Sequence, residues 1–365
     1  MIHFPELLAG LPLGSAPAPG VAGRALASSN GVAETTRAEG TDPAHTNAAS
    51  RSPGALTGRS PYSPKRSNHV LTYISHYEGL DEGLPFLTGA RTRIKLSPGD
   101  LGPRAVVMVG DTVYTANYFS DTLSALDLKA AKPQAVSIAL GPQPKLDPVR
   151  QGEFYFNDAT LCQQGWQSCA SCHPNDARVD GLNWDLLNDG IGNPKNTRSL
   201  LLAHQTPPVM ALGVRTNAEA AVRAGLQFIL FTDQPESVAA GIDDYLKSLQ
   251  PVPSPRLIKG RLSPSAKRGQ KLFTRAGCAD CHGPGSYTEL QPHDVGTRAG
   301  YDRPSDKFFT PTLIEVWRTA PCLHNGSAAT LRDVLTTGNA SGQHGDVSGL
   351  SSQAIDDLCE YVLSL

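Results

Sequence analysis

Short runs of apolar residues, alternating with polar ones and separated by turn residues, fill much of the stretch from residue 69 to residue 146. Strands in soluble proteins have this length and this two-residue alternation. Dipeptides such as Gly110-Asp111, which separates two of the runs, are typical of tight turns. We predict an all-β unit over residues 69–146, with strands at Ala105–Val109, Thr112–Asn117, Thr122–Leu128 and Ala135–Leu140.

A helical period of 3.6 residues replaces this alternation in the second half of the chain. In its last segment Ile355, Leu358, Val362 and Leu365 fall on one side of a helix, as an amphipathic helix requires. We expect the part after residue 146 to be mainly α, with helices at 218–230, 236–250, 265–275 and 351–364.

The first 68 residues show neither pattern. Between Ala27 and Pro61 the only large aliphatic residues are Val32 and Leu56, and Ala, Gly, Ser, Thr and Pro dominate. Such a segment cannot bury enough apolar surface to offset its conformational entropy. We expect residues 1–68 to be a disordered segment of low complexity.

Composition narrows the classes of function. The 365 residues include 32 Lys and Arg against 34 Asp and Glu, a net charge of −2, and no basic tract dominates the chain. This balance argues against a nucleic acid or an anionic membrane surface as the partner. No apolar run approaches the length of about 18 residues that a membrane-spanning helix needs, so no such helix is expected.

Two copies of a Cys-x-x-Cys-His motif carry the main chemical information. They are Cys169-Ala-Ser-Cys172-His173 and Cys278-Ala-Asp-Cys281-His282. In a c-type cytochrome the two thiols of such a motif bond the vinyl groups of haem, and the adjacent histidine ligates the iron. Structural zinc needs four ligands where each motif offers three, and a redox dithiol does not need the histidine. We predict two covalently bound haems c, haem 1 and haem 2 in chain order.

The two motifs lie in an internal repeat. Gly152-x-x-x-Phe156 precedes the first motif, and Gly269-x-x-x-Phe273 precedes the second. A Thr-x-Pro run follows each motif, at 206–208 and at 319–321. We therefore expect two related cytochrome c-like domains, which cover residues 147–255 and 256–365.

Residues 147–365 resemble the bacterial di-haem cytochrome c peroxidase superfamily, which includes the MauG group. The haem motifs and the segment Phe309–Leu331, FTPTLIEVWRTAPCLHNGSAATL, carry the resemblance. In that family the N-terminal haem reacts with hydrogen peroxide, and the C-terminal haem relays electrons. The resemblance implies a periplasmic or other extracytoplasmic protein, with a small cytochrome or a cupredoxin as its electron donor.

The β unit resembles a blade of the YVTN-type β-propellers over the run Pro103–Asp127. One blade cannot close a ring. The unit is therefore either the end of a propeller whose other blades are missing or a small sheet appended to the haem domains. Met1–Gly20 lacks the basic start and uninterrupted apolar core of a signal peptide, although c-type haem is attached after export. We expect that the N-terminus of this chain is truncated or wrongly assigned.

The resemblance also implies a calcium ion between the two haem domains. The family pattern places its protein ligands at Asn196, Thr319 and Pro321, the last two through their backbone carbonyls. Oxygen donors of this kind suit calcium. The alternative is an ordinary asparagine cap and a Thr-x-Pro turn with no bound ion.

The axial iron ligands depart from the family pattern. Family peroxidases usually supply a methionine to haem 2, whereas the last methionine of this chain is Met210. His344 is the nearest strong donor for haem 2, with His293 and Tyr301 as weaker candidates, and a solvent-exposed loop residue is the alternative for His344. For haem 1, His204 or Met210 is a candidate second ligand, or the iron is open to water or substrate.

The residues that handle peroxide depart as well. Thr232 stands where the family has its acid–base glutamate, and Asp233 and Glu236 are the nearby carboxylates that could replace it. Cleavage of peroxide needs a group that moves a proton between its two oxygens. Ionised surface carboxylates are the simpler interpretation of both residues. The family tryptophan between the haems is also absent, and we expect weak peroxidase turnover.

The sequence thus favours a mainly α di-haem c-type cytochrome of the peroxidase/MauG type behind an N-terminal β-propeller fragment. Electrons would enter at haem 2, and hydrogen peroxide would react at haem 1. The missing glutamate, tryptophan and methionine favour the alternative of a non-catalytic electron-transfer or redox-sensing cytochrome. A surface protein in which the propeller binds a partner is the third interpretation.

Overall fold

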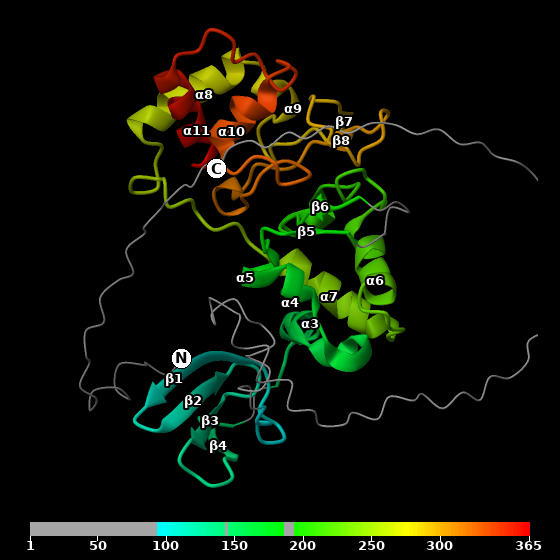
Figure 1. Ribbon diagram of the computed structural model, residues 1–365, viewed down its shortest axis with the longest axis vertical. Coiled ribbons are helices and arrows are strands. Elements are labelled where there is room, and N and C mark those ends of the chain that lie inside the picture. Colours follow the sequence, from blue (N-terminus) through cyan, green and yellow to red (C-terminus); the bar gives the residue numbers. More distant parts are fainter. Residues whose placement is uncertain (1–92, 143–144, 186–192) are drawn as a thin grey trace, which may run out of the picture. The chain divides into compact units, whose positions relative to one another are not determined.

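The computed structural model describes residues 93–142, 145–185 and 193–365 (Figure 1). The low-complexity segment 1–68, which contains Met1–Gly20, lies outside the described residues, as does the start of the expected β unit, 69–92. In the described part a four-stranded sheet comes first, and two sets of helices follow it. None of the described helices is both long and apolar enough to span a bilayer.

The sheet consists of four antiparallel strands that pair in the order β1-β2-β3-β4. The predicted strands are confirmed to within two residues, as β1 Pro103–Val109, β2 Thr112–Asn117, β3 Thr122–Asp127 and β4 Ala135–Ala139. In the register, Thr115 of β2 lies opposite Val106 on one side and Ser124 on the other. The sheet is open, so a closed propeller is not shown within the described residues.

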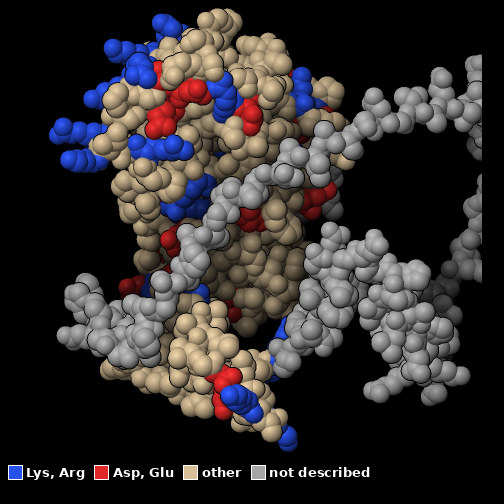
Figure 2. Space-filling view, turned by 60° about the vertical axis from the view of Figure 1, so that its left-hand side comes forward, with Lys and Arg blue, Asp and Glu red and all other residues tan. Residues whose placement is uncertain are grey.

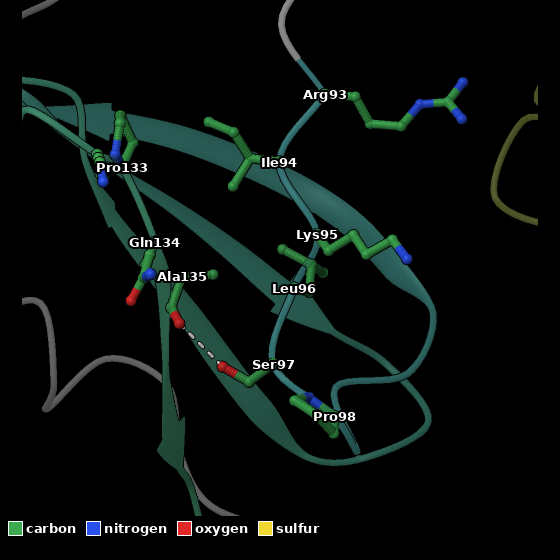
Figure 3. A pocket seen from close by; sticks show the side chains of 10 residues that line it. Arg93, Ile94, Lys95, Leu96, Ser97, Pro98, Pro133, Gln134 and Ala135 are labelled. Atoms are coloured by element: carbon green, nitrogen blue, oxygen red, sulfur yellow. Dashed lines mark hydrogen bonds between the residues drawn. The ribbon is translucent and has the colours of Figure 1, made fainter.

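A network of polar side chains joins the strands of this sheet. The Asp100 carboxylate accepts hydrogen bonds from the hydroxyls of Thr122, Ser124 and Ser137 at 2.8, 2.7 and 2.6 Å. Burial alone would raise the pKa of Asp100, but the hydroxyl donors hold it below its ordinary value. Residues 93–98 also cross β4, where the Ser97 hydroxyl donates to the Ala135 carbonyl at 3.0 Å beside a surface hollow (Figure 3).

The sheet is attached to helix α3, Pro148–Asn157, by aromatic and polar contacts. Phe119 packs edge-on against Phe154 of the helix, with ring centroids 5.2 Å apart. The Nη2 atom of Arg150, also on α3, donates to the backbone carbonyl of Tyr118 at 2.7 Å. The face of α3 that carries Arg150 and Phe154 is therefore in contact with the sheet.

The first set of helices carries the first Cys-x-x-Cys-His motif. Its elements are α3, α4 Cys169–Cys172, α5 Pro174–Ala177, α6 Ala218–Phe228 and α7 Glu236–Ser248, with short strands β5 Asn183–Trp184 and β6 Lys195–Asn196. Helix α3 begins after Asp147, whose carboxylate accepts the backbone N–H of Arg150 at 2.8 Å, an N-cap that satisfies a free donor of the first turn.

The second set carries the second motif. Its elements are α8 Pro264–Arg275, α9 Cys278–Cys281, α10 Leu331–Leu335 and α11 Ser352–Val362, with short strands β7 Pro292–His293 and β8 Phe308–Phe309. The four predicted helices are confirmed, within two residues at each end, as α6, α7, α8 and α11. Short 3-10 helices complete the two sets at η1 Ala159–Leu161, η2 Gln163–Gly165, η3 Ala203–Gln205, η4 Val316–Arg318 and η5 Thr337–Asn339.

In each set the first and last helices touch at a glycine. A Cβ added to Gly152 of α3 would lie 1.8 Å from the carbonyl oxygen of Gly241 in α7. A Cβ added to Gly269 of α8 would lie 1.9 Å from the carbonyl oxygen of Asp357 in α11. Real Cβ atoms do not approach an oxygen this closely, so both contacts require glycine.

Further features recur at matching places in the two sets. Phe156 packs on Tyr245 with ring centroids 5.3 Å apart, and Phe273 packs on Tyr361 at 5.2 Å. Both Thr-x-Pro runs contain a cis proline, at Pro208 and at Pro321. The repeat in the sequence is therefore a repeat in three dimensions, while the domain boundaries 147–255 and 256–365 stay a prediction.

We predict that Gly269→Ala destabilises the protein by about 1–3 kcal/mol, because the added methyl group forces α8 away from α11. Gly225→Ala is the matched control, since a Cβ at this glycine of α6 meets nothing within 4 Å. The control is expected to stabilise the helix by about 0.5–1 kcal/mol. Urea unfolding of the haem-loaded protein measures both effects, and equal stability of the two variants would contradict the helix contact.

A charged contact beside Gly269 gives the stability a pH dependence. The carboxylate of Asp357 on α11 accepts two hydrogen bonds from Arg268 on α8, at 2.6 and 2.7 Å, and one from Ser265 at 2.5 Å. The Arg268 guanidinium lowers the pKa of Asp357 to about 2. Because an unfolded aspartate titrates near about 3.9, the contact stabilises the fold above that pH and is lost as the pH falls from about 4 to about 2.

Asp357→Asn should therefore be less stable than the wild type at pH 6, and the difference should vanish near pH 2. Urea unfolding at a series of pH values checks this course. Asp244→Asn, which changes an exposed carboxylate on α7, is the control and should follow the wild type throughout. A stability difference for Asp357→Asn that persists unchanged at pH 2 would argue against a charge contribution.

Candidate haem sites

Each Cys-x-x-Cys-His motif forms one turn of helix that ends at its histidine. In α4, Ser171 accepts the backbone N–H of Ser168 at 3.0 Å, which fixes the start of the turn. The backbone N–H of His173 then donates to the Cys169 carbonyl at 3.0 Å. The motif in α9 is built alike, with the His282 N–H donating to the Cys278 carbonyl at 2.9 Å. The two thiols and the imidazole of each motif thus come from one short, fixed segment.

The two motif histidines are oriented in the same way. The Nδ1–H of His173 donates to the Arg178 carbonyl at 3.2 Å, and that of His282 donates to the Tyr287 carbonyl at 3.0 Å. A proton held on Nδ1 leaves the lone pair of Nε2 free for a metal. Burial lowers the pKa of both histidines, which favours the neutral form that iron ligation requires.

A second histidine faces the motif histidine of the second set. The rings of His344 and His282 have centroids 6.5 Å apart and planes 35° apart. Two imidazoles on opposite sides of one metal ion, with metal–nitrogen bonds of about 2 Å, would have centroids separated by about 6.3 Å. The observed spacing therefore leaves room for one iron ion between the rings.

The loop that carries His344 is held by a buried asparagine. Asn339 donates from Nδ2 to the carbonyls of His344 and Gly345, at 3.1 and 3.0 Å, and accepts the His344 N–H at 2.8 Å. The Nδ1 atom of His344 is buried without a hydrogen-bond partner. Burial and the neighbouring His282 lower the pKa of His344 to about 4. His344 is thus half-buried in a loop that Asn339 holds, and its role as an iron ligand stays a prediction.

The weaker candidates for haem 2 lie in other environments. The Nε2 atom of His293 donates to Glu289 at 2.9 Å and is 3.8 Å from the Cys281 sulfur, and Tyr301 is 72% exposed. Cys281, Glu289 and His293 place their ligand atoms within 4.8 Å of one another, a spacing that would suit a metal ion. In a haem-bound protein the Cys281 sulfur is a thioether, so this group forms part of the haem 2 surroundings.

The first set shows no matching histidine pair. Among the described residues, no second histidine ring lies against His173 as His344 lies against His282. His204 donates from Nε2 to Asp243 at 2.9 Å and keeps a buried Nδ1 without a partner. Met210 has a left-handed backbone, φ 75°, and matches Leu323, φ 72°, in the second set. The second ligand of haem 1 thus remains a choice among His204, Met210 and an open iron.

Two further side chains carry N–H donors that would suit the carboxylates of a haem. The indole Nε1 of Trp317 is buried without an acceptor, although an indole N–H can only donate. Arg198 is half-buried, and burial lowers its pKa to about 10. Its Nη1 donates to the Met210 carbonyl at 2.9 Å. A haem carries two carboxylates, so it would offer an acceptor to the Trp317 indole and a counter-charge to Arg198. Sequence reasoning missed both residues, because isolated Trp and Arg carry no spacing signal.

The residues proposed for proton transfer lie at the surface. Asp233 is exposed, and the exposed carboxylate of Glu236 pairs with Arg223. The hydroxyl of Thr232 accepts a hydrogen bond from Gln234 at 2.8 Å. These positions favour the interpretation of Asp233 and Glu236 as ionised surface groups.

The residues proposed for calcium come from segments that meet. The backbone N–H of Asn196 donates to the His324 carbonyl at 2.8 Å, just after the turn that contains Thr319 and Pro321. The Asn196 side chain donates from Nδ2 to Asn183 at 3.1 Å. The geometry brings Asn196 to the same turn as the other two residues, and calcium itself stays a prediction.

A buried ion pair joins the two sets of helices next to haem 1. The carboxylate of Glu315 accepts from Nε and Nη2 of Arg178 at 2.8 and 3.1 Å, and from Nε of Arg318 at 2.7 Å. Arg178 and Glu315 are 3% and 1% exposed. Burial alone would raise the pKa of Glu315, but the guanidinium groups hold it below its usual range. Because the Arg178 carbonyl also orients His173, the second set contributes to the position of this predicted haem ligand.

A second buried carboxylate connects the sets on another side. Asp302 accepts hydrogen bonds from Asn193 at 2.9 Å and from His324 at 2.8 Å, and it pairs with Lys195 at 3.3 Å. Burial opposes the ionised form of Asp302, but the backbone N–H of Ala299 and these side chains hold its pKa well below the usual range. No sequence spacing signals the Arg178–Glu315 or the Asn193–Asp302 contact, because the two residues of each are more than 100 positions apart.

The chain is similar to known proteins. The Cytochrome c family model matches residues 266–365. The chain is 32% identical to hydrazine synthase subunit gamma of Kuenenia stuttgartiensis, in a match that covers 60% of this chain and 78% of that protein. It is 26% identical to methylamine utilization protein MauG of Methylorubrum extorquens, in a match that covers 62% of this chain and 78% of MauG.

A solved structure gives a likeness in three dimensions. The structure of Kuenenia stuttgartiensis hydrazine synthase pressurized with xenon contains a chain that matches with a TM-score of 0.55 and 29% identity. The match covers 60% of this chain and 88% of that chain. The matched part of this chain therefore shares its fold with a chain of that structure.

We predict that Glu315→Gln lowers the free energy of unfolding by about 3–5 kcal/mol, because it leaves the Arg178 charge buried without a counter-charge. Guanidinium unfolding of the haem-loaded protein measures the loss. Glu219→Gln is the control, since its ion pair with Lys247 is solvent-exposed and should contribute less than about 1 kcal/mol. A loss for Glu315→Gln no larger than that of the control would contradict the buried ion pair.

Proposed function

Because the chain belongs to the di-haem cytochrome c peroxidase/MauG family, which includes hydrazine synthase subunit gamma, we propose that it carries two haems c and transfers electrons between them. Covalent haem c is a property of this family. The finer assignment has haem 1 on Cys169, Cys172 and His173, and haem 2 on Cys278, Cys281 and His282.

The facing rings of His282 and His344 are the observation that carries this proposal. A haem iron with two histidine ligands changes its charge by one electron and has no free coordination position for a substrate. The chain's own contribution is to hold both rings still. The Tyr287 carbonyl orients His282, and Asn339 fixes the loop of His344, so little reorganisation accompanies a change of iron charge.

Haem 1 is proposed as the acceptor of these electrons. The Arg178 carbonyl orients His173, and the Arg198 guanidinium supplies a positive charge that suits a haem carboxylate. In the described part of the chain no histidine faces His173, so an external molecule such as hydrogen peroxide has a possible binding place. Thr232 and the exposed Asp233 and Glu236 offer no held acid–base group, which supports weak peroxide turnover.

The partners follow from this assignment. We propose a small cytochrome or a cupredoxin as the electron donor, and a periplasmic or other extracytoplasmic location, where haem c is attached. The non-catalytic alternative, an electron-transfer or redox-sensing cytochrome, has the same donor and differs only in what happens at haem 1. A bound calcium ion at Asn196, Thr319 and Pro321 would hold the segment between the haems.

His344→Ala tests the proposal. The wild type should contain two haems per chain by pyridine haemochrome assay, with one low-spin haem whose EPR spectrum indicates two histidine ligands. The variant should turn that haem high-spin and raise its reduction potential, because an imidazole is lost from the iron. His293→Ala is the control, since His293 binds Glu289 instead, and its spectrum should match the wild type.

Two outcomes would overturn this assignment. One haem per chain would remove haem 1 or haem 2, and single alanine variants of Cys172 and Cys281 would show which one is present. A His344→Ala spectrum identical to that of the wild type would exclude His344 as a ligand. Addition of peroxide separates the alternatives at haem 1, since an unchanged haem 1 spectrum leaves electron transfer without peroxide chemistry.

A further inference from the structure

We propose that the exposed side of helix α8 is the docking surface for an acidic redox protein that delivers electrons to haem 2. The surface is the basic ridge, defined as Lys267, Lys271 and Arg275. This inference rests on the proposed entry of electrons at haem 2 and adds the place and the charge of the partner.

The ridge belongs to a local excess of positive charge that the balanced composition of the whole chain conceals. The run from residue 256 to residue 275 contains no Asp or Glu, and all of its cations are exposed, namely Arg256, Lys259, Arg261, Lys267, Arg268, Lys271 and Arg275. Figure 2 shows Lys and Arg side chains gathered at the top of the molecule, where Figure 1 places α8. Such a concentration of one sign produces a field that reaches beyond the surface.

Two of these cations form ion pairs with acidic residues of α11. Arg268 binds Asp357 of α11, and Arg256 lies 3.5 Å from Glu360. No ion pair is recorded within the described residues for Lys267, Lys271 or Arg275. Their charges are therefore available to a partner.

The ridge follows the exposed side of α8 and ends close to the attachment site of haem 2. Positions 267, 271 and 275 are four residues apart, so they follow one line along α8 over about 12 Å. The opposite side of the helix packs Ala266, Gly269 and Phe273 into the core. Cys278, the first haem 2 thiol, follows Arg275 by three residues, so a protein bound on the ridge lies next to the haem attachment.

The first set of helices provides an internal comparison. The residues of α3 and its end that match the ridge are Arg150, Phe154 and Asp158, counted from the matched glycines Gly152 and Gly269. Helix α3 packs on α7 as α8 packs on α11, so the fold does not need three cations at these places. In α3 the matching face is already occupied, because Phe154 and Arg150 contact the β-sheet. This face of the repeat thus contacts the β-sheet in the first set, whereas in the second set it is exposed and basic.

The dipole of α8 does not account for the ridge either. Cations are favourable near the last turn of a helix, which fits Arg275, but they are unfavourable near the first turn, where Lys267 lies. The continuous line of charge from one end to the other is better explained by a ligand outside the helix.

The chemistry of the surface selects an acidic protein. The other exposed side chains of α8 between the ridge positions are Arg268, Gln270 and Thr274, and all three are polar or charged. The exposed side of the helix therefore lacks the apolar groups that insert into a membrane surface. Its aromatic residue, Phe273, is buried and cannot stack on a nucleotide base. Transient electron-transfer complexes bury little area and rely on opposite charges for fast encounter. An exposed ridge of Lys and Arg beside a haem suits that kind of partner.

Charge reversal of the ridge tests the proposal. The test variant is K267E/K271E/R275E, and the matched control is K95E/K132E/K145E, which makes the same change in net charge at exposed lysines before α3. The probes are a reduced acidic cupredoxin and a reduced basic cytochrome c. Stopped-flow absorption follows the second-order rate constant for reduction of haem 2 in the haem-loaded protein at several salt concentrations.

With the acidic cupredoxin, the wild type should react faster at low salt and lose at least about tenfold in rate as the salt is raised, and the control should behave alike. The ridge variant should be slower at low salt by at least about tenfold, with little salt dependence. With the basic cytochrome the ridge variant should gain rate. Circular dichroism and the unchanged haem spectrum establish that the variant is folded.

Several results would overturn the docking surface. One is an equal loss of reduction rate in the ridge variant and in the control. Another is a wild type that is reduced faster by the basic donor than by the acidic one. A third is ridge-dependent binding to phosphatidylglycerol vesicles without ridge-dependent binding of copper-free acidic cupredoxin. The last measurement also separates the two proposals. If the copper-free cupredoxin binds through the ridge but the reduced form does not reduce haem 2, electron entry fails and docking stands. If the acidic cupredoxin instead reduces haem 2 of the ridge variant as fast as that of the wild type, docking on the ridge fails and electron entry at haem 2 stands.

Discussion

The close approach of two helices at a glycine determines the rest of each haem-binding set. At Gly152 and Gly269 the backbone of one helix lies against a carbonyl of its partner, and no other residue leaves space for that contact. Because the first helix of the pair is fixed there, the short segment after it is fixed as well. The Cys-x-x-Cys-His turn follows α8 almost at once, and its histidine is then oriented by a backbone carbonyl a few residues later. Helix packing, thiol position and ligand orientation are thus successive consequences of one steric constraint.

The sequence predicted the features that depend on local pattern. Alternation identified the four strands, and the 3.6-residue period identified α6, α7, α8 and α11. The motif spacing predicts two haem attachments, and the structure shows each motif as one short helical turn. His344 could be proposed because the chain lacks a methionine after Met210, and the structure adds its facing position against His282. Glu315 and Asp302 could not be found in this way. Each is an ordinary acidic residue in sequence, and its role depends on Arg178 or Asn193, which only the folded chain brings near.

The two haem surroundings differ in how completely they are closed. In the second set a paired histidine, a buried asparagine and a short loop surround the motif histidine. In the first set the candidate second ligands are Met210 and His204, and the latter is engaged by Asp243. Under the proposed function, the same repeat would hold one haem between two histidines and one haem with a single assigned histidine. The difference comes from loops between the helices, because the helix pairs themselves are alike.

Arg178 connects the two halves of the repeat. Its carbonyl serves the histidine of its own half, while its guanidinium is neutralised by a glutamate of the other half. One residue therefore couples the two halves, because a displacement of the Glu315 carboxylate would move the segment whose carbonyl orients His173. A change in the second half would consequently reach the candidate haem site of the first half through the Arg178 backbone.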